Sequence, residues 1–598
     1  RAFTGESSGG TRDTVRSFDH RNRLYKVVGP AAPFEYLVLD NLGRVTESAV
    51  FNGTSGAPTA INAPLADRGV YTRTFYSQRG LVYKKQLAID ATASSPTYLE
   101  SNYWSDAVGR GVASWAPNSP ATKVQRDGHG RIVKAYQTDR GGDALPGASS
   151  NYADATTLSS DSVLEQSEFT FDTDSSRWAG RLMMQTHRLR PHDASAGGGA
   201  LTYSTGVSTY TGHFYDEADR LIRTVEFGTN LTANAFGVGS TGSIPSWPPT
   251  NPPNHNTGGW ENQIIHAVEY DEQGRAASRI DPKGRVTKSL FDDRSRSYAT
   301  IENYENAVVA WDGTLSPPRW KVASGLSTSH LDTDRVTTRV LDGVGNVTEL
   351  VAHTPASGGG EAVQITQYVY GTSLGASTNE MDSLVASKSL VAEVRYPQES
   401  GGSAGLPGTT DAYKVKYAYN SQGELRAYAD QNGTRHVYQR DALGRPTADI
   451  ASVLGTNISN SVRRISRSFD GLGRADLVQS YSDTAGTTVV NSVRFRYTPL
   501  SQVRRVYQDH DGPLQLESSD PDSDPSSSGN TRVVIYDYQT VVPASGSGGS
   551  NFTRPASLTY PIGNYVEFGY GTSGSVDERL SRIESIVNPE TAANIVAY

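Results

Sequence analysis

Residues 435–440 contain side chains with the types and spacing for acid–base chemistry on a sugar acid. Breakdown of an acidic polysaccharide needs a base, such as histidine or tyrosine, and an arginine that neutralises the uronate carboxylate. Alternation along an extended strand places His436, Tyr438 and Arg440 on one face, which makes them candidate catalytic residues. A repetitive chain also brings such residues together by chance. A polysaccharide lyase or hydrolase therefore stays the second alternative, and we expect the protein not to be an enzyme.

Other arrangements that could hold a metal or a cofactor fail on residue type or spacing. The chain has no cysteine, which excludes thiolate metal sites, and its 11 histidines are scattered. The acidic stretch 520–524 spaces its aspartates like a calcium loop, but Pro525 stands where that loop needs glycine and Thr531 where it needs glutamate. Neither a phosphate-binding glycine loop nor a nucleophile elbow occurs. We therefore expect no metal and no cofactor.

The elements that position these residues follow from one phrase that recurs along the whole chain. Its pattern is an aromatic residue or leucine, then Asp-x-x-Gly, then arginine or asparagine, as in "YDEQGRA" at 270–276 and "FDGLGRA" at 469–475. Where no insertion intervenes, the copies follow each other at about 21 residues, as from Asp271 to Asp292. A fixed period of this size indicates a repeat architecture in which each copy is one structural unit.

Each copy predicts a β-hairpin. Aspartate at the first turn position can accept hydrogen bonds from backbone N–H groups two residues on, and glycine three residues later takes the left-handed conformation that closes the turn. The flanks alternate as strands do: in "SVRFRYT", Val493, Phe495 and Tyr497 share one face. We therefore predict an all-β protein, an array of hairpins in one spiralling sheet. The structural turn residues are Asp40, Gly43, Asp127, Gly130, Asp271, Gly274, Asp342, Gly345, Gly423, Asp441, Gly444, Asp470 and Gly473.

At these residues the chain resembles the tyrosine-aspartate (YD) repeats, also called rearrangement hotspot (Rhs) repeats. "YDEQGRAASRIDPKGRVTKSLFDD" and "YAYNSQGELRAYADQNGTRHVYQRDALGRPTADI" carry the resemblance, which extends over residues 18 to about 583. The family implies a continuous sheet that spirals into a hollow shell or tube segment. Such shells occur in bacterial polymorphic toxins, in insecticidal toxin complexes and in animal teneurins. The resemblance therefore implies a structural, enclosing role and an enclosed polypeptide cargo as one partner.

One departure from the family concerns self-cleavage. Shells that house a toxin usually end in a core with a DPxG element that cleaves the chain. Here "DPKG" stands at 281–284 inside a repeat, so we expect Asp281 to be a turn residue, and we expect no core or toxin domain after Tyr598.

Segments rich in glycine, serine and proline interrupt the array, and we expect them to form loops. In the continuous array over residues 1–598 they lie near 193–200, 228–260, 354–362, 396–410, 511–530 and 543–551. The second of these loops holds Trp247 and Trp260 among prolines. An exposed tryptophan can stack on a sugar, so both are candidate glycan contacts, although either can instead pin the loop to the wall. A carbohydrate-binding adhesion or extracellular fibre module is therefore the first alternative function.

Length and charge set the remaining limits. A chain of 598 residues with a net charge of −8 lacks the clustered basic surface that nucleic acid requires. No apolar run is long enough to span a bilayer. Strands with polar residues on one face predict a sheet that is wet on one side, as in a hollow assembly. We therefore expect a secreted or cell-surface bacterial shell or scaffold, which encloses, spaces or displays something. Its expected partners are enclosed cargo, a surface glycan or further copies of itself.

Overall fold

The chain forms one long antiparallel sheet, in which each strand pairs with the next one along the chain. The computed structural model describes residues 12–141, 143–146, 154–172, 180–192, 198–229, 263–315, 318–327, 329–356, 361–399, 404–514, 531–541, 552–561, 563–572, 574–589 and 593–597. The main sheet has 35 strands, and β19 and β20 form a separate two-stranded sheet. The all-β prediction is confirmed.

The elements are as follows. The first part of the chain contains β1 (Val15–Phe18), β2 (Leu24–Val28), β3 (Phe34–Leu39), β4 (Val45–Phe51), η1 (Leu65–Asp67), β5 (Arg68–Tyr76), β6 (Val82–Ala88), β7 (Tyr98–Ser105), β8 (Gly111–Trp115), β9 (Ala121–Arg126), β10 (Ile132–Thr138), η2 (Asp154–Thr156), β11 (Val163–Phe171), β12 (Leu182–Leu189), β13 (Val207–Tyr215) and β14 (Leu221–Gly228). The middle contains β15 (Ile264–Tyr270), β16 (Ala276–Ile280), β17 (Val286–Phe291), β18 (Ser297–Glu302), β19 (Val308–Asp312), β20 (Arg319–Ser324), β21 (Arg335–Leu341), β22 (Val347–Pro355), β23 (Glu361–Thr372), β24 (Ser387–Arg395) and η3 (Asp411–Tyr413). The last part contains β25 (Lys414–Tyr419), β26 (Leu425–Ala429), β27 (Arg435–Arg440), β28 (Pro446–Val453), β29 (Arg464–Phe469), β30 (Ala475–Tyr481), β31 (Val489–Tyr497), β32 (Val503–Asp509), β33 (Arg532–Val541), β34 (Phe552–Thr559), β35 (Tyr565–Gly569), α1 (Val576–Leu580), β36 (Ser585–Asn588) and β37 (Ala593–Ala597).

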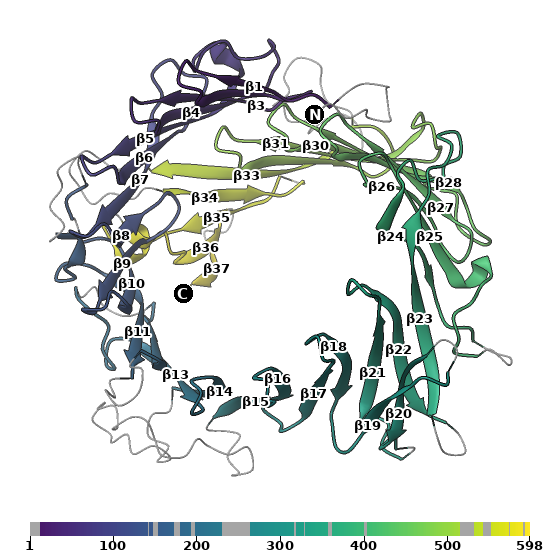
Figure 1. The fold of residues 1–598 in the computed structure, drawn as a ribbon. Helices are drawn as coiled ribbons and strands as arrows, with labels where there is room; N and C mark the ends of the chain where they lie inside the picture. Colours follow the sequence, from purple (N-terminus) through teal and green to yellow (C-terminus); the bar gives the residue numbers. More distant parts are fainter. Residues whose placement is uncertain are drawn as a thin grey trace.

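The sheet curls into a ring around an open centre and then continues past its own beginning (Figure 1). Because adjacent strands are antiparallel, their connections alternate between two rims. One rim, here the tip rim, holds turns of the Asp-x-x-Gly type, among them 40–43, 106–109, 441–444 and 470–473. The other rim, here the loop rim, holds longer connections, among them 29–33, 52–67, 116–120, 139–162 and 190–206.

The ring is closed by a seam in which the tip rim of the second pass, from residue 404 on, lies against the loop rim of the first pass. Arg12 forms an ion pair with Glu424 at 3.2 Å, across 412 positions of sequence. Arg579 of α1 donates a hydrogen bond to Ser162 Oγ at 3.1 Å, across 417 positions. Arg579 also pairs with Asp139 at 3.1 Å. These contacts hold the spiral at a fixed pitch.

The seam also has an apolar part, in which glycines on the loop rim receive leucines from the tip rim. Leu472 lies at the tip between β29 and β30 and packs against Gly69 of β5. A β-carbon built on Gly69 would stand 2.8 Å from Leu472 Cγ, so the two passes approach closely only because this residue is glycine. Leu443 lies in the same way beside Gly29, with its Cδ2 3.5 Å from the β-carbon that Gly29 lacks.

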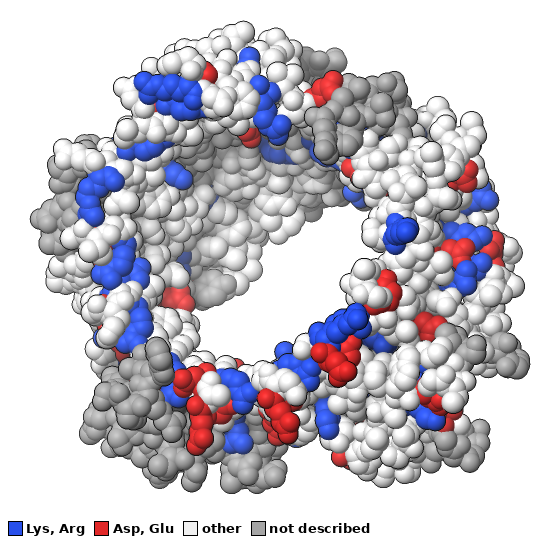
Figure 2. Space-filling model, viewed as in Figure 1, with Lys and Arg blue, Asp and Glu red and all other residues white. Residues whose placement is uncertain are grey.

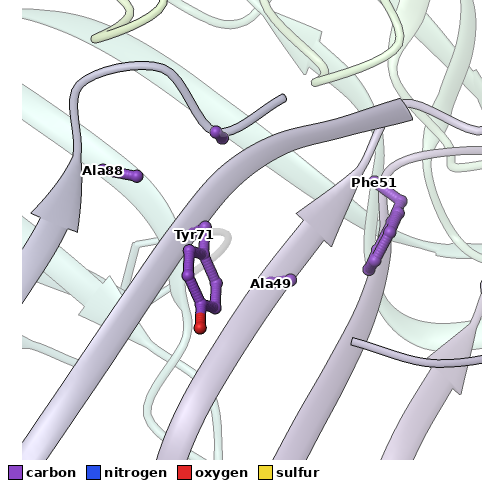
Figure 3. Close-up of a cluster of buried hydrophobic side chains, with 5 residues drawn as sticks. Ala49, Phe51, Tyr71 and Ala88 are labelled. Carbon is purple, nitrogen blue, oxygen red and sulfur yellow. The ribbon is translucent and has the colours of Figure 1, made fainter. Parts of the chain in front are cut away.

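Buried apolar residues form small clusters beneath the longer connections instead of one central core. In one cluster, Ala49, Phe51, Tyr71 and Ala88 come from three neighbouring strands and pack with Ala91 of the following connection (Figure 3). In another, the β19–β20 hairpin covers Ile301 and Val336 with Val322. A single-layered wall has no interior of its own, so each connection that folds back on the sheet makes a local core.

Part of one expected loop is strand. The 354–362 segment was expected to be loop because of its glycines and proline, but β22 continues to Pro355 and β23 begins at Glu361. Pro355 pairs with Glu361 at the end of the ladder. A proline is compatible with this position because the ladder ends there and needs no further donor from it. Of the other expected loops, residues 193–197, 230–260, 400–403, 515–530 and 543–551 lie outside the described residues.

A compensation experiment tests the seam. We predict that Gly69→Ala lowers the free energy of unfolding by about 1–3 kcal/mol, because the new methyl group overlaps Leu472. Adding Leu472→Ala should restore part of that loss, so the two changes together cost less than their sum in chemical denaturation. The matched control is Gly128→Ala, where nothing lies within 4 Å of the added carbon. Simple additivity of the two seam variants would contradict the contact.

Candidate functional site

The repeated hairpin tip is organised by one aspartate carboxylate. At 40–43, Asp40 Oδ1 accepts hydrogen bonds from the backbone N–H groups of Leu42 at 2.9 Å and Arg44 at 3.0 Å. Asp40 Oδ2 accepts a bond from Arg44 Nε at 2.7 Å. Gly43 completes the turn with a φ of 84°, a conformation that glycine adopts without strain. The carboxylate therefore holds both the turn and the arginine side chain.

The arginine then connects its tip to the next hairpin. The Arg44 guanidinium lies over the ring of Tyr76 at 4.4 Å. The Tyr76 hydroxyl donates a hydrogen bond back to the carbonyl oxygen of Val45, the residue after the arginine, at 2.9 Å. A cation over an aromatic face is stabilising, and the returning hydrogen bond fixes the ring's position. Each unit thus positions its neighbour, and we call this chain of contacts the aspartate–arginine–aromatic relay.

The relay recurs around the ring. Asp470, Arg474, Tyr497 and the Ala475 carbonyl oxygen repeat it in the second pass, with the guanidinium 4.4 Å from the ring and the hydroxyl bond at 2.8 Å. The guanidinium-over-ring contact also joins Arg131 to Phe171, Arg220 to Tyr270, Arg275 to Phe291 and Arg445 to Phe469.

The predicted turn residues all lie at tips of this kind. Asp127, Asp271, Asp441 and Asp470 bind the arginine four positions on, and Asp342 binds Asn346 Nδ2 instead. The glycines Gly130, Gly274, Gly345, Gly423, Gly444 and Gly473 have φ between 80° and 99°. Asp281 makes the same kind of turn on the loop rim, where its carboxylate accepts a hydrogen bond from Arg285 at 2.7 Å. The sequence pattern contained the arginine and the aromatic residue, but their direct contact joins different repeats and was not foreseen.

The electrostatics of the tips favour ionised aspartate. The side-chain hydrogen bond from Arg23 lowers the pKa of Asp19 to about 2. At Asp40, the backbone hydrogen bond from Arg44 is the largest cause of a lowered pKa, and the Arg44 side chain adds to it. Where an arginine stands four positions after the aspartate, as at Asp19 and Asp40, it neutralises the negative charge of the carboxylate.

The candidate catalytic residues lie together on β27, but His436 and Arg440 already have structural partners. His436 Nδ1 bonds to Asp449 Oδ1 at 2.6 Å, and the ring stacks on Tyr428 at 4.9 Å. Arg440 donates to the carbonyl oxygens of Gly444 and Leu425, at 2.9 and 3.2 Å. The arginine is thus committed to the neighbouring hairpins.

A cavity of about 230 Å³ lies beside these residues. Tyr438, Arg440, Asp449 and Arg467 are among its lining residues. Burial and the nearby Asp449 raise the pKa of Tyr438 to about 12, so the phenol is a poor base at neutral pH. The arrangement supports packing between β27 and β28 better than it supports catalysis.

Another histidine has the contacts of a catalytic triad but no access for a substrate. His353 Nε2 bonds to Thr338 Oγ1 at 2.8 Å, and His353 Nδ1 bonds to Glu361. Both Thr338 and His353 are buried. The other oxygen of Glu361 accepts a hydrogen bond from the backbone N–H of Val322 at 3.2 Å. The group therefore anchors the β19–β20 hairpin to the main sheet.

Several other expectations are limited by what the structure describes. Trp247 and Trp260, the candidate glycan contacts, and the aspartates of 520–524 lie outside the described residues. In the part of the chain that the structure describes, no three histidine or acidic side chains gather as a metal site would need. Nor does that part contain a helix with the length and apolar character to cross a membrane.

Comparison with known proteins gives similarities of fold. No family model matches the chain, and no curated protein matches it. Among solved structures, it is similar to a chain of the Tc holotoxin pore of Photorhabdus luminescens, with 11% identity and a TM-score of 0.46, over 100% of this chain and 32% of that one. It is also similar to a chain of a TcdB2-TccC3 crystal structure, with 13% identity and a TM-score of 0.28, over 98% and 32%. The chain thus spans about a third of the solved chains it matches, and this likeness assigns it no activity, substrate or partner.

The tip electrostatics predict a specific pH dependence. A carboxyl whose pKa is lower in the folded state than its usual 3.9 or so when unfolded contributes stability that is complete above that value and is lost as pH falls through the folded pKa. We therefore expect a melting temperature that is steady from pH 7 to about 5 and declines between about 4 and 2. The difference between wild type and Asp40→Asn should shrink over the same interval in thermal denaturation. A difference that stays constant down to pH 2 would show that the Asp40 charge contributes nothing.

The relay itself is tested by removing one hydroxyl. Tyr497→Phe keeps the ring over Arg474 but leaves the Ala475 carbonyl oxygen without its donor, so we expect a loss of about 1 kcal/mol in the free energy of unfolding. Tyr203→Phe is the matched control, because Tyr203 is 70% exposed. Equal effects of the two variants in denaturant titrations would argue against the returning hydrogen bond.

Proposed function

We propose that this protein is a non-enzymatic structural shell, whose wall encloses a polypeptide. The observation that carries the proposal is the continuous sheet that closes on itself around an open centre (Figures 1 and 2). Most of the chain is used to build this wall, and a closed wall is useful mainly for what it surrounds. The seam supports the proposal, because its contacts connect the first and second passes of the sheet. The residues in these contacts are hundreds of positions apart in the sequence.

The chemistry of the wall favours the same function. In the relay, the aspartates and arginines of the tips bind each other. Among the candidate catalytic residues, Arg440 donates hydrogen bonds to backbone oxygens. The resemblance of the repeats to YD repeats also supports a shell, in a protein that is secreted or at the cell surface of a bacterium. Glycan binding through Trp247 and Trp260 stays a prediction, which a glycan array with Trp247→Ala would test.

The position of the last strands gives a direct test. In Figure 1, the last strand, β37, lies within the ring, whereas the first strand, β1, lies in the wall. We attach one short peptide with a site for a specific protease after Tyr598, and in a second protein the same peptide before Arg1. Cleavage after Tyr598 should be about tenfold slower or more, because an enclosed site is cut only when the wall opens.

The seam provides the control for this experiment. Gly69→Leu should bring the two cleavage rates closer together, because it forces apart the passes that enclose the site. Equal rates in the unaltered protein would contradict an enclosing wall.

A further inference from the structure

The tip rim of the first pass exposes large apolar side chains at one repeated position. This is the third residue of the Asp-x-x-Gly turn, and its side chain is 78% exposed at Leu42, 72% at Val108 and 86% at Val344. Turn positions are usually polar, and one exposed apolar residue needs no explanation. The same position is charged or polar at other tips of this rim, such as Arg79, His129 and Gln273, so Leu42, Val108 and Val344 are separate apolar points along it.

The second pass shows what this position does when it is covered. Leu443 and Leu472 occupy the same place in their turns, and they are the leucines that meet Gly29 and Gly69 at the seam. Leu443 is 37% exposed, about half as much as Leu42. At the seam, an apolar residue at the third turn position of the tip rim thus packs against a loop rim of the same molecule.

The opposite end of the molecule presents a loop rim that no described part of the chain is seen to cover. At the end of β28 and in the connection to β29, the second pass exposes Val453 by 40%, Ile458 by 47% and Val462 by 38%. These residues lie at the rim that corresponds to the receiving side of the seam. One end of the molecule therefore exposes a tip rim and the other end exposes a loop rim. These are the two kinds of surface that contact each other at the seam.

Charge at the tip rim is mixed, because the third turn position holds Arg21, Arg79 and Arg294 at other tips, while the turn aspartates are paired. Asp40 and Asp106 are each neutralised by the arginine four positions on, at 2.6 and 2.7 Å. Figure 2 shows Lys and Arg next to Asp and Glu along the lower part of the opening, and Lys and Arg with few acidic residues along its left side. At the tips of Leu42 and Val108, the paired aspartates bring no unpaired negative charge to a contact.

We propose that a second copy of this chain docks end to end, with the tip rim of one copy against the second-pass loop rim of the other. The contact extends the geometry of the seam from within one chain to between two chains. It joins different surfaces on the two copies, so it is head-to-tail and leaves one free end of each kind. The proposal rests on the fold and would stand or fail independently of an enclosed cargo.

Sedimentation velocity over a range of concentrations up to about 100 µM tests the proposal, since a contact of modest area gives weak association. Leu42→Glu with Val344→Glu blocks the tip rim, and Ile458→Glu with Val462→Glu blocks the loop rim. Each blocked protein should associate at least about tenfold less than wild type, because a charge must then be buried in the contact. The control Asn41→Asp adds a charge at the same tip but keeps Leu42, and it should associate nearly as wild type does.

Mixing the two blocked proteins distinguishes head-to-tail docking from every symmetric arrangement. Each protein retains the end that the other has lost, so the mixture should form dimers and nothing larger. Melting temperatures equal to wild type would show that both variants fold, as expected for exposed positions. A wild type that stays monomeric throughout, or a mixture that forms no dimer although wild type associates, would overturn the proposal.

Discussion

The hydrogen-bonded pair of an aspartate and the arginine four residues later is the interaction on which the rest of this structure depends. The aspartate closes its own turn through two backbone N–H groups and orients the arginine through its second oxygen. The oriented guanidinium lies over the aromatic ring of the next unit, and the hydroxyl of that ring donates a hydrogen bond back to the residue after the arginine. An exposed ion pair alone contributes little. Here the ion pair belongs to a network of contacts that positions the next hairpin. It therefore contributes to the geometry of the sheet as well as to its stability.

A wall one sheet thick must find its stability without a central core. The relay supplies contacts between neighbouring units, and the longer connections cover small apolar clusters such as the one around Phe51 and Tyr71. Such a chain would otherwise behave as a one-dimensional array, in which each unit is held only by its neighbours. The seam changes this, because Gly69 and Leu472 or Arg12 and Glu424 connect units that are far apart in sequence. The seam therefore closes what would otherwise be an open ribbon into a ring.

The parts of this structure that could be predicted from sequence are the ones with local causes. Asp271 and Gly274 determine a turn within four residues, and the alternation around Phe495 determines a strand, so the hairpins follow from the residues themselves. The closure of the ring does not follow from local sequence. Nothing near Gly69 indicates that it packs against Leu472, which lies 403 residues further along the chain. Asn420 shows a similar limit: its Oδ1 keeps the turn, while its Nδ2 donates to Glu424 and so reverses the usual polarity of the tip. At the candidate site, alternation correctly grouped His436 with Tyr438. Arg440 donates hydrogen bonds to backbone carbonyl oxygens, and the spacing of side chains in the sequence does not predict where those oxygens lie.

Enclosure depends above all on an open centre, and small-angle X-ray scattering measures this most directly. A compact globular chain of this length would have a radius of gyration near 25 Å by the usual scaling, because its mass fills the middle. In a ring, the mass lies away from the centre. We predict a radius of gyration clearly above about 25 Å, with a distance distribution shifted towards large separations, at concentrations where the protein is monomeric. A monomer at or below about 25 Å would contradict the shell and would favour several small, filled β domains.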